Sequence, residues 1–237
     1  MTVSDRTYFT LKRLHSLSGV VPIGVFLLEH FFTNSFAVQG PEAFNRAAEH
    51  LAEIPYVVLI EIFGIGLPIL FHMVLGLVIV TTGQANAAKY RYQNNWMYLL
   101  QRVSGLFLVA YILYHVWTTR LSPEVMRGET DLFGMMSDDL RNPALFAFYV
   151  LGVLAASYHF GNGLFGFAIH WGLATGRRAQ RNVARLGLAV FVVLSLVGIN
   201  SLLAFIHRPV RMFERAPEAK PASSPAAPAA RPGGGTR

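Results

Sequence analysis

Five long apolar stretches constrain this chain more than any other feature of its sequence. They lie at roughly residues 14–37, 55–83, 96–120, 143–171 and 184–207. A helix needs about 20 apolar residues to cross a bilayer, because each residue advances it by about 1.5 Å. The 237 residues are 53% hydrophobic and only 14% charged, with a mean hydropathy of +0.42, which is more apolar surface than a soluble core can cover. We predict an all-α integral membrane bundle of five transmembrane helices.

Basic residues near the ends of these stretches predict the orientation of the bundle. They gather around the beginnings of the first, third and fifth stretches, at Arg6, Lys12, Arg13, Lys89, Arg91, Arg102, Arg177, Arg178, Arg181 and Arg185. Because basic loops stay in the cytoplasm, we predict a cytoplasmic N-terminus. The same retention accounts for most of the net charge of +7, so no binding to nucleic acid is expected.

Four histidines occur one to a stretch in the first four stretches, at His30, His72, His115 and His159. Successive helices cross the membrane in opposite directions, and the rise of 1.5 Å per residue converts sequence position into depth. His30 and His115 then lie toward the outer face, and His72 and His159 toward the inner face. Each pair offers two imidazole nitrogens to one iron, which is the ligation of a bis-histidine haem b. We predict two haem b groups between the first four helices.

An intramembrane histidine has other uses, including a proton path, a hydrogen bond between helices and a quinone site. The occurrence of one histidine on each of four consecutive helices, at two matching depths, favours haem over these alternatives. Arg13, His15 and Arg102, at the inner helix ends, are candidates for contacts with the propionates of the inner haem. Ordinary membrane anchoring explains them equally well. Solvation at an interface accounts for the remaining histidines: His50, His170 and His207.

The chain contains no cysteine. It therefore offers no ligand for a Cys-bound iron–sulfur cluster and no attachment site for c-type haem. The segments between the apolar stretches are too short for a flavin or nucleotide domain. We interpret the chain as a membrane anchor and electron carrier, with residues 1–210 forming a five-helix di-haem cytochrome b domain. Residues 211–237 are rich in Pro, Ala and Gly, and we predict a disordered tail there.

Several local motifs fall in the order and spacing of a known family. They are Arg13-Leu-His-Ser-Leu-Ser-Gly19, Glu29-His30, Leu67-Pro-Ile-Leu-Phe-His72, Asn95-Trp-Met, Gln101-Arg-Val-Ser-Gly105, His115-Val-Trp117 and His159-Phe-Gly-Asn-Gly163. From about residue 7 to 207 the chain resembles the single-chain, five-helix cytochrome b558 subunits of succinate dehydrogenase, in particular the Bacillus-type subunits with two haems. The cytochrome b of fumarate reductase is a more distant likeness. The tail has no counterpart in the pattern.

The resemblance implies a place in respiratory complex II, in a bacterial cytoplasmic membrane. Such subunits anchor a flavoprotein with covalent FAD and an iron–sulfur protein at the cytoplasmic face, so the FAD and the clusters belong to the partner subunits. They carry electrons between succinate or fumarate and a quinone, usually menaquinone, and so link the tricarboxylic acid cycle to the respiratory chain. Carried over residue by residue, the resemblance also makes His30, His72, His115 and His159 the haem ligands.

The same resemblance favours a quinone site beside the outer haem, where Glu29, Asn34 and Glu61 lie at a suitable depth. A quinone site needs an apolar pocket, polar groups for the two carbonyls and a route for protons. Glu61 lies about six residues into the second stretch, where a carboxylate is costly unless it is paired or hydrated. Proton exchange with quinone is one interpretation of Glu61, and an arginine or backbone partner at the interface is the other.

Two other classes of protein remain as alternatives. A cytochrome b561-type ferrireductase also places one histidine on each of four helices, but it usually has six spans and works without a soluble dehydrogenase. A haem-free transporter or anchor would use its histidines for transport or packing. Co-purification of flavin and iron–sulfur subunits would exclude the first class, and a Soret band would exclude the second.

Overall fold

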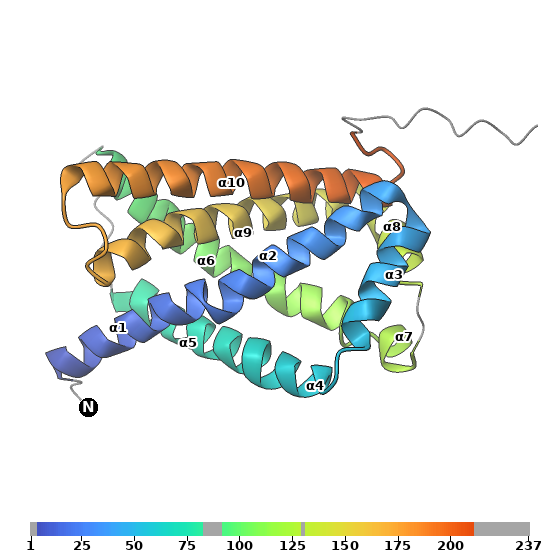
Figure 1. Cartoon of the computed structure of the whole chain (residues 1–237), viewed down its shortest axis with the longest axis horizontal. Coiled ribbons are helices and arrows are strands. Elements are labelled where there is room, and N and C mark those ends of the chain that lie inside the picture. Colours follow the sequence, from blue (N-terminus) through green and yellow to red (C-terminus); the bar gives the residue numbers. More distant parts are fainter. Residues whose placement is uncertain (1–3, 83–91, 129–130, 211–237) are drawn as a thin grey trace, which may run out of the picture.

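The computed structural model describes residues 4–82, 92–128 and 131–210, which fold into a bundle of helices (Figure 1). The elements are α1 (Asp5–Val20), α2 (Pro22–Ser35), η1 (Phe36–Gln39), α3 (Pro41–Ala52), α4 (Val57–Leu59), η2 (Ile60–Gly66), α5 (Leu67–Thr82), α6 (Gln93–Thr118), α7 (Pro123–Met126), α8 (Leu132–Leu140), α9 (Pro143–His170) and α10 (Arg177–Phe205). Here η1 is a 3-10 helix and η2 is a π-helix. These residues contain no strand, which confirms the all-α prediction. The predicted tail, residues 211–237, lies outside the described residues.

Five helical stretches are long and apolar enough to cross a membrane, as the sequence predicts. They are Asp5–Gln39, Val57–Thr82, Gln93–Thr118, Pro143–His170 and Arg177–Phe205. No residue of α4, η2 or α5 is buried, and large side chains such as Phe32, Phe63 and Leu196 are exposed. An apolar exterior of this extent suits a bilayer, where lipid tails replace water around the helices.

Two of the spans are irregular beside a proline. Pro22 begins α2 just after α1 ends at Val20, because proline has no N–H for the helical ladder and its ring clashes with the preceding turn. Pro68 is the second residue of α5 and follows the π-helix directly. There the N–H of Leu67 bonds to the carbonyl of Ile62, five residues back. Both spans therefore change their backbone geometry partway across the membrane.

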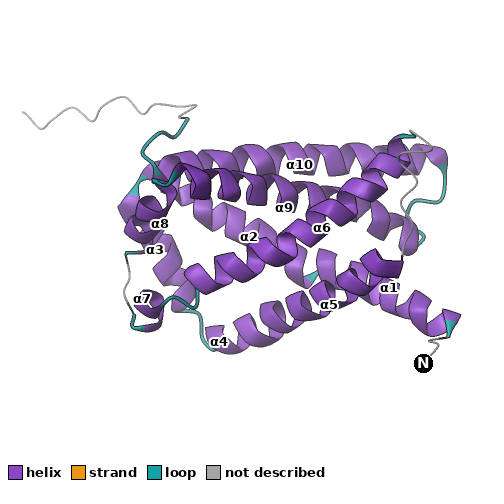
Figure 2. Ribbon diagram, turned by 180° about the vertical axis from the view of Figure 1, so that it is seen from behind, coloured by secondary structure: helices purple, strands orange, loops and turns teal. Residues whose placement is uncertain are grey.

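Helix α9 lies at the centre of the bundle and contacts α1, α6 and α10. Helix α10 runs beside it, α1 and α2 cross on one face (Figure 1), and α6 crosses on the opposite face (Figure 2). The closest approach joins Gly161 of α9 to Gly187 of α10, where a Cβ atom on either glycine would collide with the backbone carbonyl of the other. Without a side chain at these positions the two backbones can touch, as is common between membrane helices.

A buried cluster closes the end of the bundle that we predict to face outward, called the outer end, where α3 and α8 cover the ends of α9 and α10. Its members are Ala37, Phe44, Phe133, Met136, Leu140, Tyr149, Leu202, Ala204 and Phe205. Asn45 of α3 joins the two loop helices, because its amide contacts the Asp131 carboxylate at 3.1 Å and the N–H of Phe133 at 3.0 Å. Asp131 also caps α8 by accepting from Gly134. These two donors hold the pKa of the Asp131 carboxyl below its ordinary value.

Candidate functional site

The structure brings the four intramembrane histidines together in two pairs, and the outer pair joins α2 to α6. The ring centroids of His30 and His115 lie 5.7 Å apart, with the ring planes at 78°. One turn earlier on each helix an aromatic ring flanks its histidine, because residues i and i+4 share a helix face: Phe26 is 5.5 Å from His30, and Tyr111 is 5.7 Å from His115. The hydroxyl of Tyr149, from α9, lies 3.4 Å from Nδ1 of His115.

The inner pair joins α5 to α9. The ring centroids of His72 and His159 lie 6.2 Å apart, with the planes at 81°. Nδ1 of each ring faces a backbone carbonyl on a neighbouring helix, that of His15 on α1 for His72 and that of Gln101 on α6 for His159. Both pairs therefore consist of histidines on diagonally related helices, at the two depths that the sequence predicts.

The separations of the paired rings fit an iron atom between them. With metal–nitrogen bonds of about 2 Å, and about 1 Å from each nitrogen to its ring centre, two imidazoles on one metal have centroids about 6 Å apart. The observed separations are 5.7 and 6.2 Å. Because the porphyrin supplies the equatorial ligands, a haem needs only two histidines. The described residues contain no group of three or more His, Cys, Asp or Glu that could hold a metal ion by themselves.

Of the predicted propionate contacts, His15 lies against the inner pair, and Arg13 lies two residues before it on α1. The His15 ring stacks on the ring of His72, with centroids 3.9 Å apart, and the Arg13 guanidinium lies 4.0 Å from the ring centre of Trp171. Nε of Arg13 and Nδ1 of His15 are buried and have no hydrogen-bond partner among the described residues. A buried polar group without a partner is costly, so these nitrogens suit an added anionic acceptor such as a carboxylate.

Arg102, the third predicted propionate contact, has partners of its own. Its guanidinium lies 3.8 Å from the ring centre of Tyr98, one turn earlier on α6. Its Nη2 donates to the carbonyl of Ile79 on α5, at 3.3 Å. This contact ties the inner ends of α5 and α6 together, which is a structural role alongside the predicted one.

Two of the three predicted quinone contacts bond within their own helix. Glu29 accepts a hydrogen bond from the hydroxyl of Thr33 at 2.5 Å. Nδ2 of Asn34 donates to the carbonyl of His30 at 2.7 Å. Glu29 directly precedes His30, and Asn34 lies one turn after it; both side chains are only partly buried, so they have some access to the surroundings.

Glu61, the third predicted quinone contact, lies in η2 and pairs with Arg120, just beyond the end of α6. Nε of Arg120 is 3.0 Å from Oε1 of Glu61, and Nη2 is 2.8 Å from Oε2. Of the two interpretations of Glu61, the structure supplies the arginine partner. The pair connects the second and third spans, and it does so from a π-helix, an element that is frequent at functional sites.

Sequence reasoning assigned no role to four residues that touch the inner histidines. Ser18 and Gly19 of α1 contact His72, and Ser104 and Gly105 of α6 contact His159. A signal was present, because the same Ser-Gly dipeptide occurs in the first and third stretches at nearly the same depth. The sequence could not show which helix each dipeptide would face.

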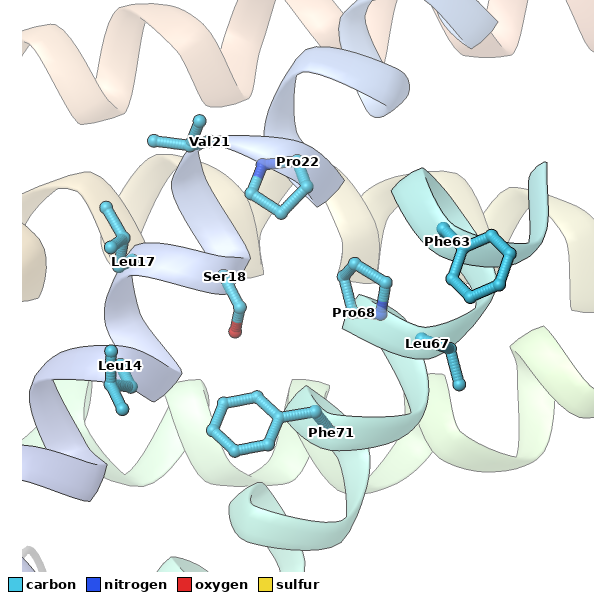
Figure 3. Close-up of a pocket in the computed structure, with 9 residues that line it drawn as sticks. All are labelled: Leu14, Leu17, Ser18, Val21, Pro22, Phe63, Leu67, Pro68 and Phe71. Atoms are coloured by element: carbon cyan, nitrogen blue, oxygen red, sulfur yellow. The ribbon is translucent and has the colours of Figure 1, made fainter. Parts of the chain in front are cut away.

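A shallow apolar groove of about 460 Å³ opens beside the inner pair, between α1 and α2 on one side and η2 and α5 on the other. Figure 3 shows Pro22 and Pro68, the residues of the two backbone irregularities, on opposite sides of the groove. Its lining is Leu14, Leu17, Ser18, Val21, Pro22, Phe63, Leu67, Pro68 and Phe71. Because this lining is almost entirely apolar, the groove offers no group for acid–base or redox chemistry.

Comparisons with known proteins identify the family of this chain. The model of the family described as "Succinate dehydrogenase/Fumarate reductase transmembrane subunit" matches residues 83–199. The chain is also 42% identical over 204 residues to the succinate dehydrogenase cytochrome b558 subunit of Bacillus subtilis (strain 168), and the alignment covers 86% of this chain and 100% of that relative. This chain therefore belongs to the succinate dehydrogenase/fumarate reductase transmembrane subunit family.

Proposed function

We propose that this chain is the membrane-anchor cytochrome b subunit of a succinate:quinone oxidoreductase, respiratory complex II. His30 and His115 would hold an outer haem b, and His72 and His159 an inner one. The observation that carries the proposal is the meeting of these histidines in two pairs, with centroid separations that suit one iron each. The name of the similar protein, a succinate dehydrogenase cytochrome b558 subunit, supports haem b as the cofactor.

When bound, the two haems supply one-electron carriers at two depths of the membrane. The four histidines hold them in place, and the apolar faces of α2, α5, α6 and α9 keep water from the space between the rings. Arg13 and His15 would donate to the propionates of the inner haem, since their buried nitrogens lack other partners. Arg102, already bonded to α5, would add positive charge at the same end of the bundle.

We place quinone reduction near the outer pair, with Glu29, Asn34 and Glu61 as the polar groups of its site. A quinone takes up two electrons and two protons as it becomes a quinol, so the site must deliver protons as well as electrons. Asn34 would donate to a quinone carbonyl. Glu29 and Glu61 would pass protons, and Arg120 would hold the Glu61 carboxylate in position. Menaquinone is the quinone that the family resemblance favours.

The partners and the location follow from the same proposal. The chain would lie in the bacterial cytoplasmic membrane with a cytoplasmic N-terminus, because segments rich in Lys and Arg remain on the cytoplasmic side of a membrane. The iron–sulfur subunit would dock on this positive face and carry the flavoprotein subunit with its FAD. Residues 1–210 would form the transmembrane domain.

The test is a reduced-minus-oxidised spectrum with a haem-to-protein ratio, measured on the parent and on His115→Ala. We expect two b haems in the parent and about one in the variant, with the remaining haem still reducible by succinate in the assembled complex. His50→Ala, at an exposed position of α3, is the matched control and should keep both haems. A parent without haem would sink the cytochrome proposal, and haem without co-purifying flavin and iron–sulfur subunits would favour a cytochrome b561-type protein.

A further inference from the structure

The two inner histidines each lie against a five-residue segment of the same form on a neighbouring helix. In each segment a residue whose carbonyl faces the histidine is followed three positions later by serine and four positions later by glycine. The segments are His15-Ser-Leu-Ser-Gly19 on α1 and Gln101-Arg-Val-Ser-Gly105 on α6. We call them the serine–glycine segments. They come from helices on opposite faces of the bundle (Figures 1 and 2), so the inner pair is held from both sides in the same way.

The hydrogen bonds of the two segments agree closely. Nδ1 of His72 lies 3.0 Å from the carbonyl oxygen of His15 and 3.2 Å from Oγ of Ser18. Nδ1 of His159 lies 3.1 Å from the carbonyl oxygen of Gln101 and 3.1 Å from Oγ of Ser104.

Each serine hydroxyl also bonds to the carbonyl of its own segment. The distance is 2.9 Å from Ser18 to His15 and 3.1 Å from Ser104 to Gln101. In both segments the serine hydroxyl, the backbone carbonyl and Nδ1 of the histidine therefore lie within hydrogen-bond distance of one another.

This arrangement fixes the tautomer of both rings. A backbone carbonyl can only accept a hydrogen bond, so Nδ1 must carry the hydrogen. Each serine hydroxyl gives its own hydrogen to that carbonyl, which leaves the lone pairs of Oγ to accept from the same Nδ1–H. Nε2 is then free of hydrogen and has its lone pair available for a metal.

The glycines let each ring approach the backbone of the neighbouring helix. An ideal Cβ atom at Gly19 would lie 2.6 Å from Cε1 of His72, and one at Gly105 would lie 2.9 Å from Cε1 of His159. Neither distance leaves room for a methyl group. Any side chain at either position would therefore push the ring away from its carbonyl and serine partners.

The outer histidines have no such support. The Nδ1 of His115 faces the hydroxyl of Tyr149 at 3.4 Å, and a hydroxyl can either donate or accept, so it does not decide the tautomer. The His30 ring has ring contacts with Phe26 and His115 but no hydrogen bond to another described residue. The difference separates the two pairs chemically, although all four ligands are histidines.

We propose that the two serine–glycine segments are positioning elements for the inner haem alone, fixing the tautomer, orientation and electron donation of His72 and His159. This proposal rests on the proposed function. A hydrogen-bond acceptor on the distal nitrogen of a haem-ligating histidine raises the basicity of the ligand and so alters the reduction potential of the iron. Replacing the serines should therefore shift the properties of the inner haem while leaving its occupancy intact.

The first experiment compares Ser18→Ala and Ser104→Ala with the parent in the purified complex. We expect both haems to be retained, with a shifted midpoint potential and EPR signal for the inner haem only, identified as the haem that survives in His115→Ala. Threonine at the same positions keeps a hydroxyl and should restore the parental values. Ser195→Ala is the matched control, because this buried serine on α10 has no hydrogen-bond partner among the described residues.

The second experiment tests the glycines. Gly19→Ala and Gly105→Ala should lower the haem-to-protein ratio from two to about one by losing the inner haem. Gly166→Ala, on α9, should keep both, because a Cβ atom there meets nothing within 4 Å. Parental potentials and EPR signals in both serine variants, or two haems in both glycine variants, would overturn the proposal. A parent without haem would instead refute the proposed function, so the two failures can be told apart.

Discussion

The contact between Gly161 and Gly187 gives the sharpest prediction about what holds the ligand helices in place. Gly161 lies on α9 two residues after His159, and the structure sets its Cα against the backbone carbonyl of Gly187 on α10. A methyl group at Gly161 would collide with main-chain atoms that no rotamer change can move. The variant Gly161→Ala must therefore push α10 away from α9 or remain under strain.

The size of the effect follows from two opposing contributions. Replacing glycine by alanine inside a helix favours the helix by up to about 1 kcal/mol. Overpacking by one methyl group against a rigid contact costs about 1–3 kcal/mol. Gly166→Ala, on the same helix with open space at its Cβ, receives the first contribution without the second. The difference in free energy of unfolding between the two variants therefore isolates the collision and should be about 1–3 kcal/mol in favour of Gly166→Ala.

Reversible unfolding in mixed detergent and SDS, followed by the near-ultraviolet signal of the aromatic residues, would measure this difference. Gly187→Ala provides an independent check, because its Cβ atom would collide with the carbonyl of Gly161 in the same way. Equal stabilities for Gly161→Ala and Gly166→Ala would mean that α9 and α10 do not touch through their backbones. The position of His159 would then have to be maintained by other contacts.

Two more predictions concern the outer end. A double-mutant cycle with Glu61→Gln and Arg120→Gln should give a coupling of roughly 0.2–1 kcal/mol in the free energy of unfolding, because the side chains of Glu61 and Arg120 are 35% and 46% exposed. Quinone turnover and its pH profile should change in Glu61→Gln if Glu61 passes protons, and an unchanged turnover and profile would remove Glu61 from the quinone site. The pKa of Asp131 is lower in the folded protein than its ordinary value of 3.8. The ionised carboxylate therefore stabilises α8 fully at pH values above 3.8, and this stabilisation is lost as the pH falls through the lower pKa of the folded state. Hydrogen exchange of α8 should therefore be faster in Asp131→Ala than in the parent at pH 7, and that difference should shrink in acid; a constant difference would contradict the assignment.

Much of the architecture was predictable from the sequence. The five spans were found because a bilayer imposes a length and a composition on any helix that crosses it. The bounds of the second, third and fourth spans agree with the predicted stretches to within about three residues, whereas the first and fifth helices begin earlier, at Asp5 and Arg177. The pairing of His30 with His115 and of His72 with His159 was predictable because the rise of a helix converts position into depth. The family assignment is confirmed by the comparisons, whereas the roles of the four histidines as haem ligands stay a prediction.

Other features could not be predicted in this way. The loop helices α3 and α8 are short, and they become stable only by burying side chains such as Phe44 and Phe133 against the ends of α9 and α10. The arginine that pairs with Glu61 lies 59 residues away in the sequence, so nothing local identified Arg120 as that partner. The break before Pro22 depends on proline chemistry, but its position opposite Pro68 depends on how α1 and α5 are arranged.

The sequence by itself therefore determined that the chain crosses a membrane five times and that four histidines lie at two depths. Both follow from properties that hold for one helix at a time: its length, its apolar content and its rise per residue. Only the tertiary structure decided that Ser18 and Gly19 face His72 and that Ser104 and Gly105 face His159. Such contacts depend on the rotation of each helix about its axis and on its crossing angle with its neighbours, and these are set by packing between helices.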